Sequence, residues 1–326
     1  MAFNVVRYRH DDREHWGVVR AGTITPLVGQ FPTTGDVVRH LSTSGPVVAA
    51  DAVDAARVTI LSPITRNQQF VCLGANYRQH MIESGMDPDV KSFNMVFTKA
   101  PSCIVPADSD VVRPRRVRFL DYEIELGIVV RRDITAETVV TDANLPEFVA
   151  GAVIVNDYSA RDVQIPQMQF YKGKSFRTFG PVGPYLCMLE ARDMPALGDL
   201  RLTLTVNGEV RQRDSTRNLV YGPAETLTEL SGVHDLHPGD LIATGTPAGC
   251  ALSIPSPTMQ RLAALLPERM RWDAFMRVQA SRPGYLKPGD VVEASIRSDD
   301  GAIDLGVQRN RIVEEGRESV AGRRPA

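Results

Sequence analysis

Short runs of apolar residues, each bounded by turn-forming residues, dominate the chain and predict a strand-rich protein of the α+β class. One helix is predicted over Thr34–Leu41, because its opening Thr-Gly-Asp is typical of a helix start. The predicted strands are Phe3–Tyr8, Trp16–Val19, Tyr122–Val130, Ala152–Val155, Leu200–Val206, Leu241–Thr244 and Val291–Ile296.

A polar, turn-rich segment at residues 62–68 divides this pattern. We therefore predict a small N-terminal α+β domain over residues 1–62 and a main domain over residues 68–313. Within the main domain, apolar positions at helical spacing predict one or two helices over Thr258–Val278. The polar tail, residues 314–326, predicts disorder.

Two turn signals stand out in the main domain. Asn207-Gly208 lies between strand-like runs and predicts a tight hairpin. Pro-Gly-Asp precedes apolar runs twice, at residues 238–240 and 288–290, where it would form a turn that leads into a strand. The repetition indicates either two related halves of a rolled or barrel-like sheet, or simply a turn that is common before strands.

Composition narrows the class of protein. The net charge of -2 and the pI near 6.3 give no electrostatic basis for binding nucleic acid or an anionic membrane. No apolar run reaches the roughly 18 residues that a membrane-spanning helix needs. The four cysteines have no Cys-x-x-Cys spacing and predict reduced thiols, and the N-terminus lacks the apolar core of a secretory signal. We expect a cytoplasmic protein.

The most informative chemistry lies in one predicted strand, where Asp121, Glu123 and Glu125 alternate with apolar residues. Alternation puts the three carboxylates on one face, with the Cα atoms of Glu123 and Glu125 about 6.6 Å apart. Like charges this close inside an apolar strand repel each other and are costly to desolvate. A bound cation would offset both costs.

A further carboxylate, Asp157, ends the next apolar strand. Three oxygen ligands without paired His or Cys favour a hard ion such as Mg²⁺ or Mn²⁺. The alternative is an amphipathic strand whose glutamates face water, with Arg161 or nearby arginines as partners.

Motifs that occur in one order between residues 71 and 313 resemble those of the fumarylacetoacetate hydrolase family. They are Leu73-Gly-Ala-Asn-Tyr-Arg-Gln-His80 followed by Glu83, Asp121-Tyr-Glu-Ile-Glu-Leu126, Asn156-Asp-Tyr-Ser-Ala-Arg-Asp162, Lys174-Ser-Phe176, Gly180-Pro-Val-Gly-Pro184 and Gly245-Thr-Pro-Ala-Gly249. The resemblance implies a mixed β-roll core with short peripheral helices, and a dimeric protein.

The same resemblance implies roles for single residues. Glu123, Glu125 and Asp157 would bind the metal, Lys174 would lie beside the substrate, and His80 with Glu83 would activate water. Expected substrate contacts are Asn76, Tyr77, Arg78, Tyr158, Gln164, Arg177, Gly245 and Thr246. By spacing alone, His80 and Glu83 would be an exposed helical pair, and Lys174 a loop lysine beside Lys172.

The chain departs from the family pattern in two places. Arg177 stands where the family often has an aspartate, which either favours a more anionic substrate or leaves an outward-pointing side chain. An inserted helical segment at about 251–284 lengthens the connection after Gly249. Because an insertion at the rim of a site can reshape a pocket, the substrate of this chain cannot be inferred from that of any single family member.

The leading functional hypothesis is hydrolysis of a C–C bond in a small 2,4-dioxo acid, acylpyruvate-like or fumarylpyruvate-like, through a metal-stabilised enolate, as in aromatic catabolism. The alternatives are a 2-oxo acid decarboxylase (oxaloacetate-like), a hydroxydienedioate isomerase, or a binding protein that retains the fold without turnover. No Gly-rich phosphate loop or Gly-x-Ser-x-Gly motif occurs. The expected partners are a small anionic 2-oxo acid, Mg²⁺ or Mn²⁺ as cofactor, and a second copy in a homodimer.

Overall fold

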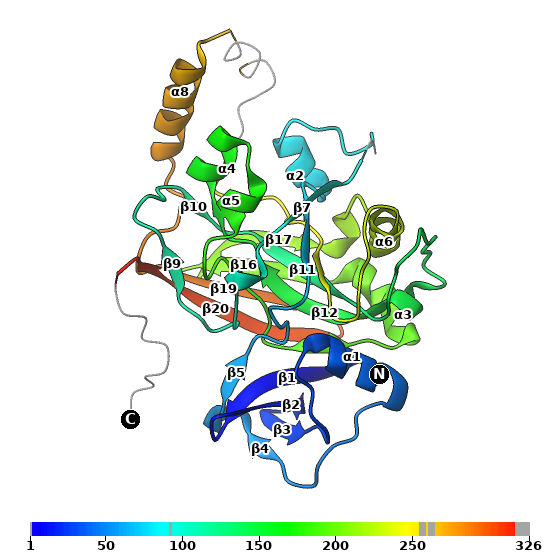
Figure 1. The fold of residues 1–326 in the computed structure, drawn as a ribbon. Coiled ribbons are helices and arrows are strands. Elements are labelled where there is room, and N and C mark those ends of the chain that lie inside the picture. Colours follow the sequence, from blue (N-terminus) through cyan, green and yellow to red (C-terminus); the bar gives the residue numbers. More distant parts are fainter. Residues whose placement is uncertain (1, 91–92, 254–258, 260–264, 317–326) are drawn as a thin grey trace.

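The computed structural model describes residues 2–90, 93–253, 259 and 265–316, and its core is two sheets that pack into a β-roll (Figure 1). The strands of the larger sheet are, in spatial order, β4 (Val53–Asp54), β3 (Thr23–Pro26), β2 (Arg13–Arg20), β1 (Phe3–His10), β15 (Leu186–Met188), β12 (Val149–Asn156), β11 (Ile124–Val130), β18 (Leu241–Ala243), β6 (Phe70–Gly74) and β7 (Met95–Thr98), with β5 (Thr59–Leu61) paired to β1. The strands of the smaller sheet are β17 (Glu209–Ser215), β16 (Arg201–Val206), β19 (Val291–Arg297), β20 (Asp304–Glu314) and β9 (Val111–Arg113).

Two short ribbons and several short helices complete the fold. The ribbons pair β10 (Leu120–Asp121) with β13 (Ser159–Ala160), and β8 (Ile104–Val105) with β14 (Gly180–Pro181). The α-helices are α1 (Thr34–Ser44), α2 (Arg78–Glu83), α3 (Leu145–Phe148), α4 (Arg161–Gln167), α5 (Phe170–Lys174), α6 (Pro223–Ser231) and α8 (Glu268–Ala280). The 3₁₀ turns are Ala55–Arg57, Pro101–Cys103, Ala191–Asp199 and Thr216–Asn218. Parallel and antiparallel pairs both occur, which confirms the predicted mixed, β-rich α+β class.

Strands β11 and β12 form the centre of the molecule. Every residue of both strands is buried, which explains their continuous apolar sequence. Strands β12 and β15 approach so closely that a Cβ at Gly151 would lie 2.1 Å from the carbonyl oxygen of Cys187, so only glycine fits there. The polar ends of β11 and β12 are therefore held on rigid, buried elements.

The N-terminal strands continue the larger sheet. Strand β1 pairs with β15, with Phe3 opposite Met188, and β2 to β5 extend the sheet outward from β1. Helix α1 begins at Thr34, as predicted, and its N-cap residue is Thr33. The side chains of Thr33 and Asp36 each accept a hydrogen bond from the other's backbone N–H, which forms a capping box. The domain division at residue 62 stays a prediction.

The turn signals correspond to real turns. Asn207 and Gly208 connect β16 and β17 with φ angles of 52° and 82°. In both Pro-Gly-Asp turns the aspartate carboxylate accepts the backbone N–H three residues earlier, and the turns lead into β18 of the larger sheet and β19 of the smaller one.

Other expectations are met in part or lie outside the described residues. Strand β11 begins at Ile124, two residues later than predicted, because the backbone N–H of Glu123 bonds the side chain of Asn156 instead of a strand partner. Helix α8 covers the later part of the helical prediction, and β20 runs to Glu314. Much of 254–264 and most of the predicted disordered tail lie outside the described residues. No described helix is long and apolar enough to cross a membrane.

Candidate active site

Three carboxylates meet where β11 begins and β12 ends. Glu125 lies in β11, Glu123 precedes the strand by one residue, and Asp157 directly follows β12, whose Asn156 pairs with Ile124. One oxygen of each carboxylate lies within 4.8 Å of the others, and all three side chains are buried. The structure thus groups the three residues that the sequence assigned to a metal. Helices α2, α4 and α5 lie over this side of the roll (Figure 1).

Two buried lysines contact the carboxylates. Lys174, at the end of α5, donates to Glu123 Oε2 and Asp157 Oδ2, both at 2.5 Å, and to Ser159 Oγ at 2.8 Å. Lys99, which follows β7, donates to the other oxygen of Asp157 and to the carbonyl of Phe179. Both oxygens of Asp157 are therefore held by cations.

An arginine holds the remaining oxygen of Glu123. Arg161, at the start of α4, donates from Nη2 to Glu123 Oε1, from Nε to Asp121 Oδ2 at 2.9 Å, and from Nη1 to Gln164 Oε1 at 2.8 Å. Asp121 also accepts the backbone N–H groups of Ala251 and Leu252. Asp121 thus connects the inserted segment to the arginine that positions Glu123.

Burial and the neighbouring charges shift the pKa values of the two glutamates in opposite directions. Burial alone would raise the pKa of Glu123, but Arg161 and Lys174 lower it to about 2. Burial, together with the negative charges of Asp157 and Glu123, raises the pKa of Glu125 well above its ordinary value. Burial alone would lower the pKa of Lys174, but Asp157 and Glu123 raise it, so the lysine stays protonated.

His80 on α2 interacts electrostatically with the carboxylate cluster. Burial lowers the pKa of His80, Arg161 and Lys174 lower it further, and Glu123 and Glu83 oppose the change. The imidazole is therefore neutral near pH 7 and is electrostatically coupled to the carboxylate cluster. Among the described residues, no hydrogen bond joins His80 to Glu83.

Glu83 has another partner. Its Oε1 accepts a hydrogen bond of 3.3 Å from Gln79 on the exposed side of α2. The carboxylate of Glu83 therefore does not hold the imidazole of His80, although both residues lie on the same short helix and were expected to activate water together.

The residues expected to contact substrate divide into two groups. Gly245 donates its N–H to Glu125 at 2.9 Å, and Thr246, Asn76, Tyr77 and Gln164 are buried around the cluster. The other three point elsewhere: Arg78 pairs with Asp89 on the surface, Tyr158 bonds Asn310 in the core, and Arg177 is exposed. Alternation explains Tyr158, because its neighbour Asp157 occupies the side that faces the carboxylates.

Sequence reasoning missed Lys99 and Ser159 as parts of the site. Lys99 follows an apolar strand directly, in a chain poor in lysine, and that was the available signal. Its partner Asp157 is 58 residues away in sequence, so only the fold shows the contact.

The donor set fits a hard divalent cation. Three carboxylates supply oxygen atoms. Burial, together with the charges of Asp157 and Glu123, raises the pKa of Glu125, and a bound cation would stabilise its ionised form. Glu123, Glu125 and Asp157 would hold the ion.

The chain is similar to proteins of one known family. The family described as fumarylacetoacetate (FAA) hydrolase C-terminal matches residues 69–313. Oxaloacetate tautomerase YisK of Bacillus subtilis is 35% identical over 209 residues, which cover 63% of this chain and 67% of that protein. Mitochondrial oxaloacetate tautomerase FAHD2A of Bos taurus is 31% identical over 294 residues, 89% of this chain and 80% of that protein.

Solved structures share the fold. The fumarylacetoacetate hydrolase of Exiguobacterium antarcticum is 28% identical with a TM-score of 0.71, covering 96% of this chain and 99% of its own. A probable 2-hydroxyhepta-2,4-diene-1,7-dioate isomerase of Mycobacterium abscessus is also 28% identical, with a TM-score of 0.70 and coverage of 97% and 99%. Because the family match spans most of the chain and includes every residue of the carboxylate cluster, the chain belongs to the fumarylacetoacetate hydrolase family.

Proposed function

We propose that the protein is a tautomerase that uses Mg²⁺ or Mn²⁺ to interconvert the enol and keto forms of a small 2-oxo acid. The observation that carries the proposal is His80, a neutral base coupled to the carboxylate cluster but not hydrogen-bonded to Glu83. Enol–keto conversion needs one such base. The names of the relatives, oxaloacetate tautomerase and a dienedioate isomerase, describe the same kind of proton shift.

Different residues of the site would carry out different parts of the reaction. A divalent cation at Glu123, Glu125 and Asp157 would supply Lewis acidity toward the 2-oxo oxygen. His80 removes the proton from the carbon beside the carbonyl and returns one to oxygen, or the reverse, so that no atom is gained or lost. Protonated Lys174 contributes fixed positive charge where negative charge develops.

Hydrolysis of a 2,4-dioxo acid is the second candidate. His80 and Glu83 are three residues apart on α2, so a small rotation of Glu83 would bring it to the imidazole. An oriented imidazole could then remove a proton from water, as C–C bond hydrolysis requires.

One assay separates the candidates. Enol loss from oxaloacetate and pyruvate release from 2,4-dioxopentanoate are measured with Mg²⁺, with EDTA, and in the variants His80→Ala and Glu83→Gln. We expect fast enol loss that EDTA abolishes and that His80→Ala reduces by about 10²-fold. Glu83→Gln should leave more than half of this activity. Pyruvate release without accelerated enol loss, and its collapse in Glu83→Gln, would instead establish hydrolysis.

A further inference from the structure

A cavity lies beside α2, and its lining includes Met81 of that helix and Met95 of β7. Its volume is about 330 Å³. The cavity, which we call the methionine pocket, has Met81, Met86, Val90, Phe93, Asn94 and Met95 among its lining residues, with Asp87 beside them. Three methionines give an apolar wall that adapts to the shape of a guest.

The methionine pocket exposes apolar side chains to water and contains a hydrogen-bond donor that has no partner among the described residues. Val90 and Phe93 at its mouth are 61% and 66% exposed, which leaves apolar surface in water. Asn94 is 7% exposed, and its Nδ2 has no hydrogen-bond partner among the described residues. A buried amide donor without a partner costs free energy unless a bound molecule supplies an acceptor.

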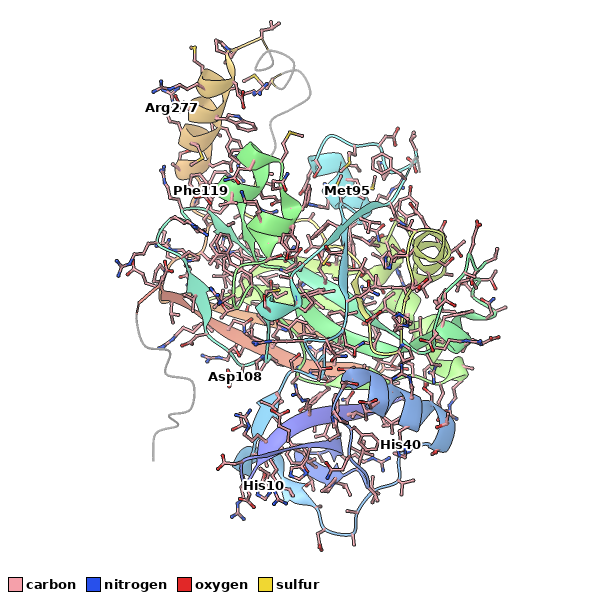
Figure 2. The ribbon with its side chains drawn as sticks, viewed as in Figure 1. His10, His40, Met95, Asp108, Phe119 and Arg277 are labelled. Atoms are coloured by element: carbon pink, nitrogen blue, oxygen red, sulfur yellow. The ribbon has the colours of Figure 1, made fainter. Side chains whose placement is uncertain are left out.

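Strand β7 and helix α2 connect the methionine pocket to the carboxylate cluster. Met95 and Phe97 are two residues apart on β7, so their side chains face the same side of the strand and their Cα atoms are about 7 Å apart. The Phe97 ring lies 5.3 Å from Lys174 Nζ, and Met81 directly follows His80 on α2. Met95 pairs with Gly74 on β6 and its side chain packs over that glycine. Figure 2 labels Met95 on β7, near α2.

We propose that the methionine pocket binds the neutral, apolar tail of a 2-oxo acid whose carboxylate end lies at the carboxylate cluster. The inference rests on the proposed function and narrows its substrate class to chains longer than the four carbons of oxaloacetate. The tail is uncharged, because the lining residues include Asp87 and no described basic side chain, which disfavours a second carboxylate there. Asn94 donates a hydrogen bond to a carbonyl or hydroxyl in that tail.

Binding of chelating analogues tests this inference without turnover. The probes are oxamate, N-propyl oxamate and N-hexyl oxamate, titrated into the Mg²⁺-loaded protein by calorimetry. Each methylene that enters an apolar pocket should tighten binding about fourfold, so N-hexyl should bind on the order of 50-fold more tightly than N-propyl. Equal affinities across the series would overturn the proposal.

A matched pair of variants locates the effect. Met86→Gln places an amide in the pocket wall and should cut the gain of N-hexyl over N-propyl oxamate by about tenfold. Met270→Gln makes the same change on α8, where Met270 is 54% exposed, and should preserve the gain. A full gain in Met86→Gln would also overturn the proposal. Binding of unsubstituted oxamate shows that each variant is folded.

The outcomes separate this inference from the proposed function. A flat series in a protein that still binds oxamate and converts oxaloacetate enol would reject the methionine pocket alone. A steep series in a protein without enol conversion would keep the pocket and reject the tautomerase. Failure to bind oxamate at all, in the presence of Mg²⁺, would overturn the pocket proposal together with its premise.

Discussion

Lys174 contributes a charge that two buried carboxylates need, so its removal should affect chemistry and stability separately. Lys174→Met should reduce kcat for enol conversion by about 10²- to 10³-fold, the usual effect of losing one preorganised electrostatic group. It also removes one of the two cations that each of Glu123 and Asp157 contacts, which should lower the melting temperature of the metal-free protein more than that of the Mg²⁺-loaded one. Unchanged kinetics would assign the role to another lysine. Lys172→Met is the control, because Lys172 is exposed and bonds Gln167.

Glu125 should make the metal-free protein less stable as the pH rises. Its pKa is raised in the folded state, so the native protein retains a proton that the unfolded chain has lost. The contribution to stability is therefore greatest at acidic pH and falls as the pH passes upward toward the folded-state pKa. Glu125→Gln should raise the melting temperature in EDTA at neutral pH and remove the gain that Mg²⁺ gives. Glu147→Gln, at an exposed position of α3, should do neither.

At the scale of elements, the sequence predicted those features that depend only on residues close together in the chain. The alternation of Asp121, Glu123 and Glu125 in an apolar run indicated one carboxylate face, and Asn207-Gly208 indicated its hairpin. Contacts between distant segments had no local signal. The pairing of Lys99 with Asp157 depends on how β7 packs against the end of β12, and the partner of Glu83 depends on the rotamer that α2 allows.

Helix α8 should depend on a single buried amide. It projects from the body (Figure 1), and among its residues only Gln279 is buried. Gln279 donates to the carbonyl of Ser253 at 2.9 Å and accepts from Tyr285 Oη at 2.6 Å. Gln279→Ala removes both bonds, at a cost of about 1–3 kcal/mol, and should accelerate amide hydrogen exchange in α8 while β11 stays protected. Met270→Ala on the same helix is the control, and equal exchange in the two variants would contradict this role.

At the scale of the whole molecule, the continuity of the larger sheet predicts one cooperative unfolding transition. Met188 is paired with Phe3 on one side and Gly151 on the other, so it connects the N-terminal strands to the central ones. Met188→Ala should cost about 2–5 kcal/mol and lower a single calorimetric transition. Met168→Ala, at an 81% exposed position, should change little. Two separate transitions in the wild type would show that residues 1–62 unfold independently, as the predicted domain division implies.

Because the pKa of Glu125 is raised, binding of a cation at the site should be coupled to loss of a proton. An ion that enters must displace the proton that Glu125 holds in its absence, so loading should release protons into solution and tighten as the pH rises. His80 imposes a different limit, since acid protonates the base itself. The acid side of the activity profile should therefore have two components. One component reflects loss of the bound cation, and added Mg²⁺ should shift it toward lower pH. The other reflects protonation of His80, and added Mg²⁺ should leave its midpoint unchanged.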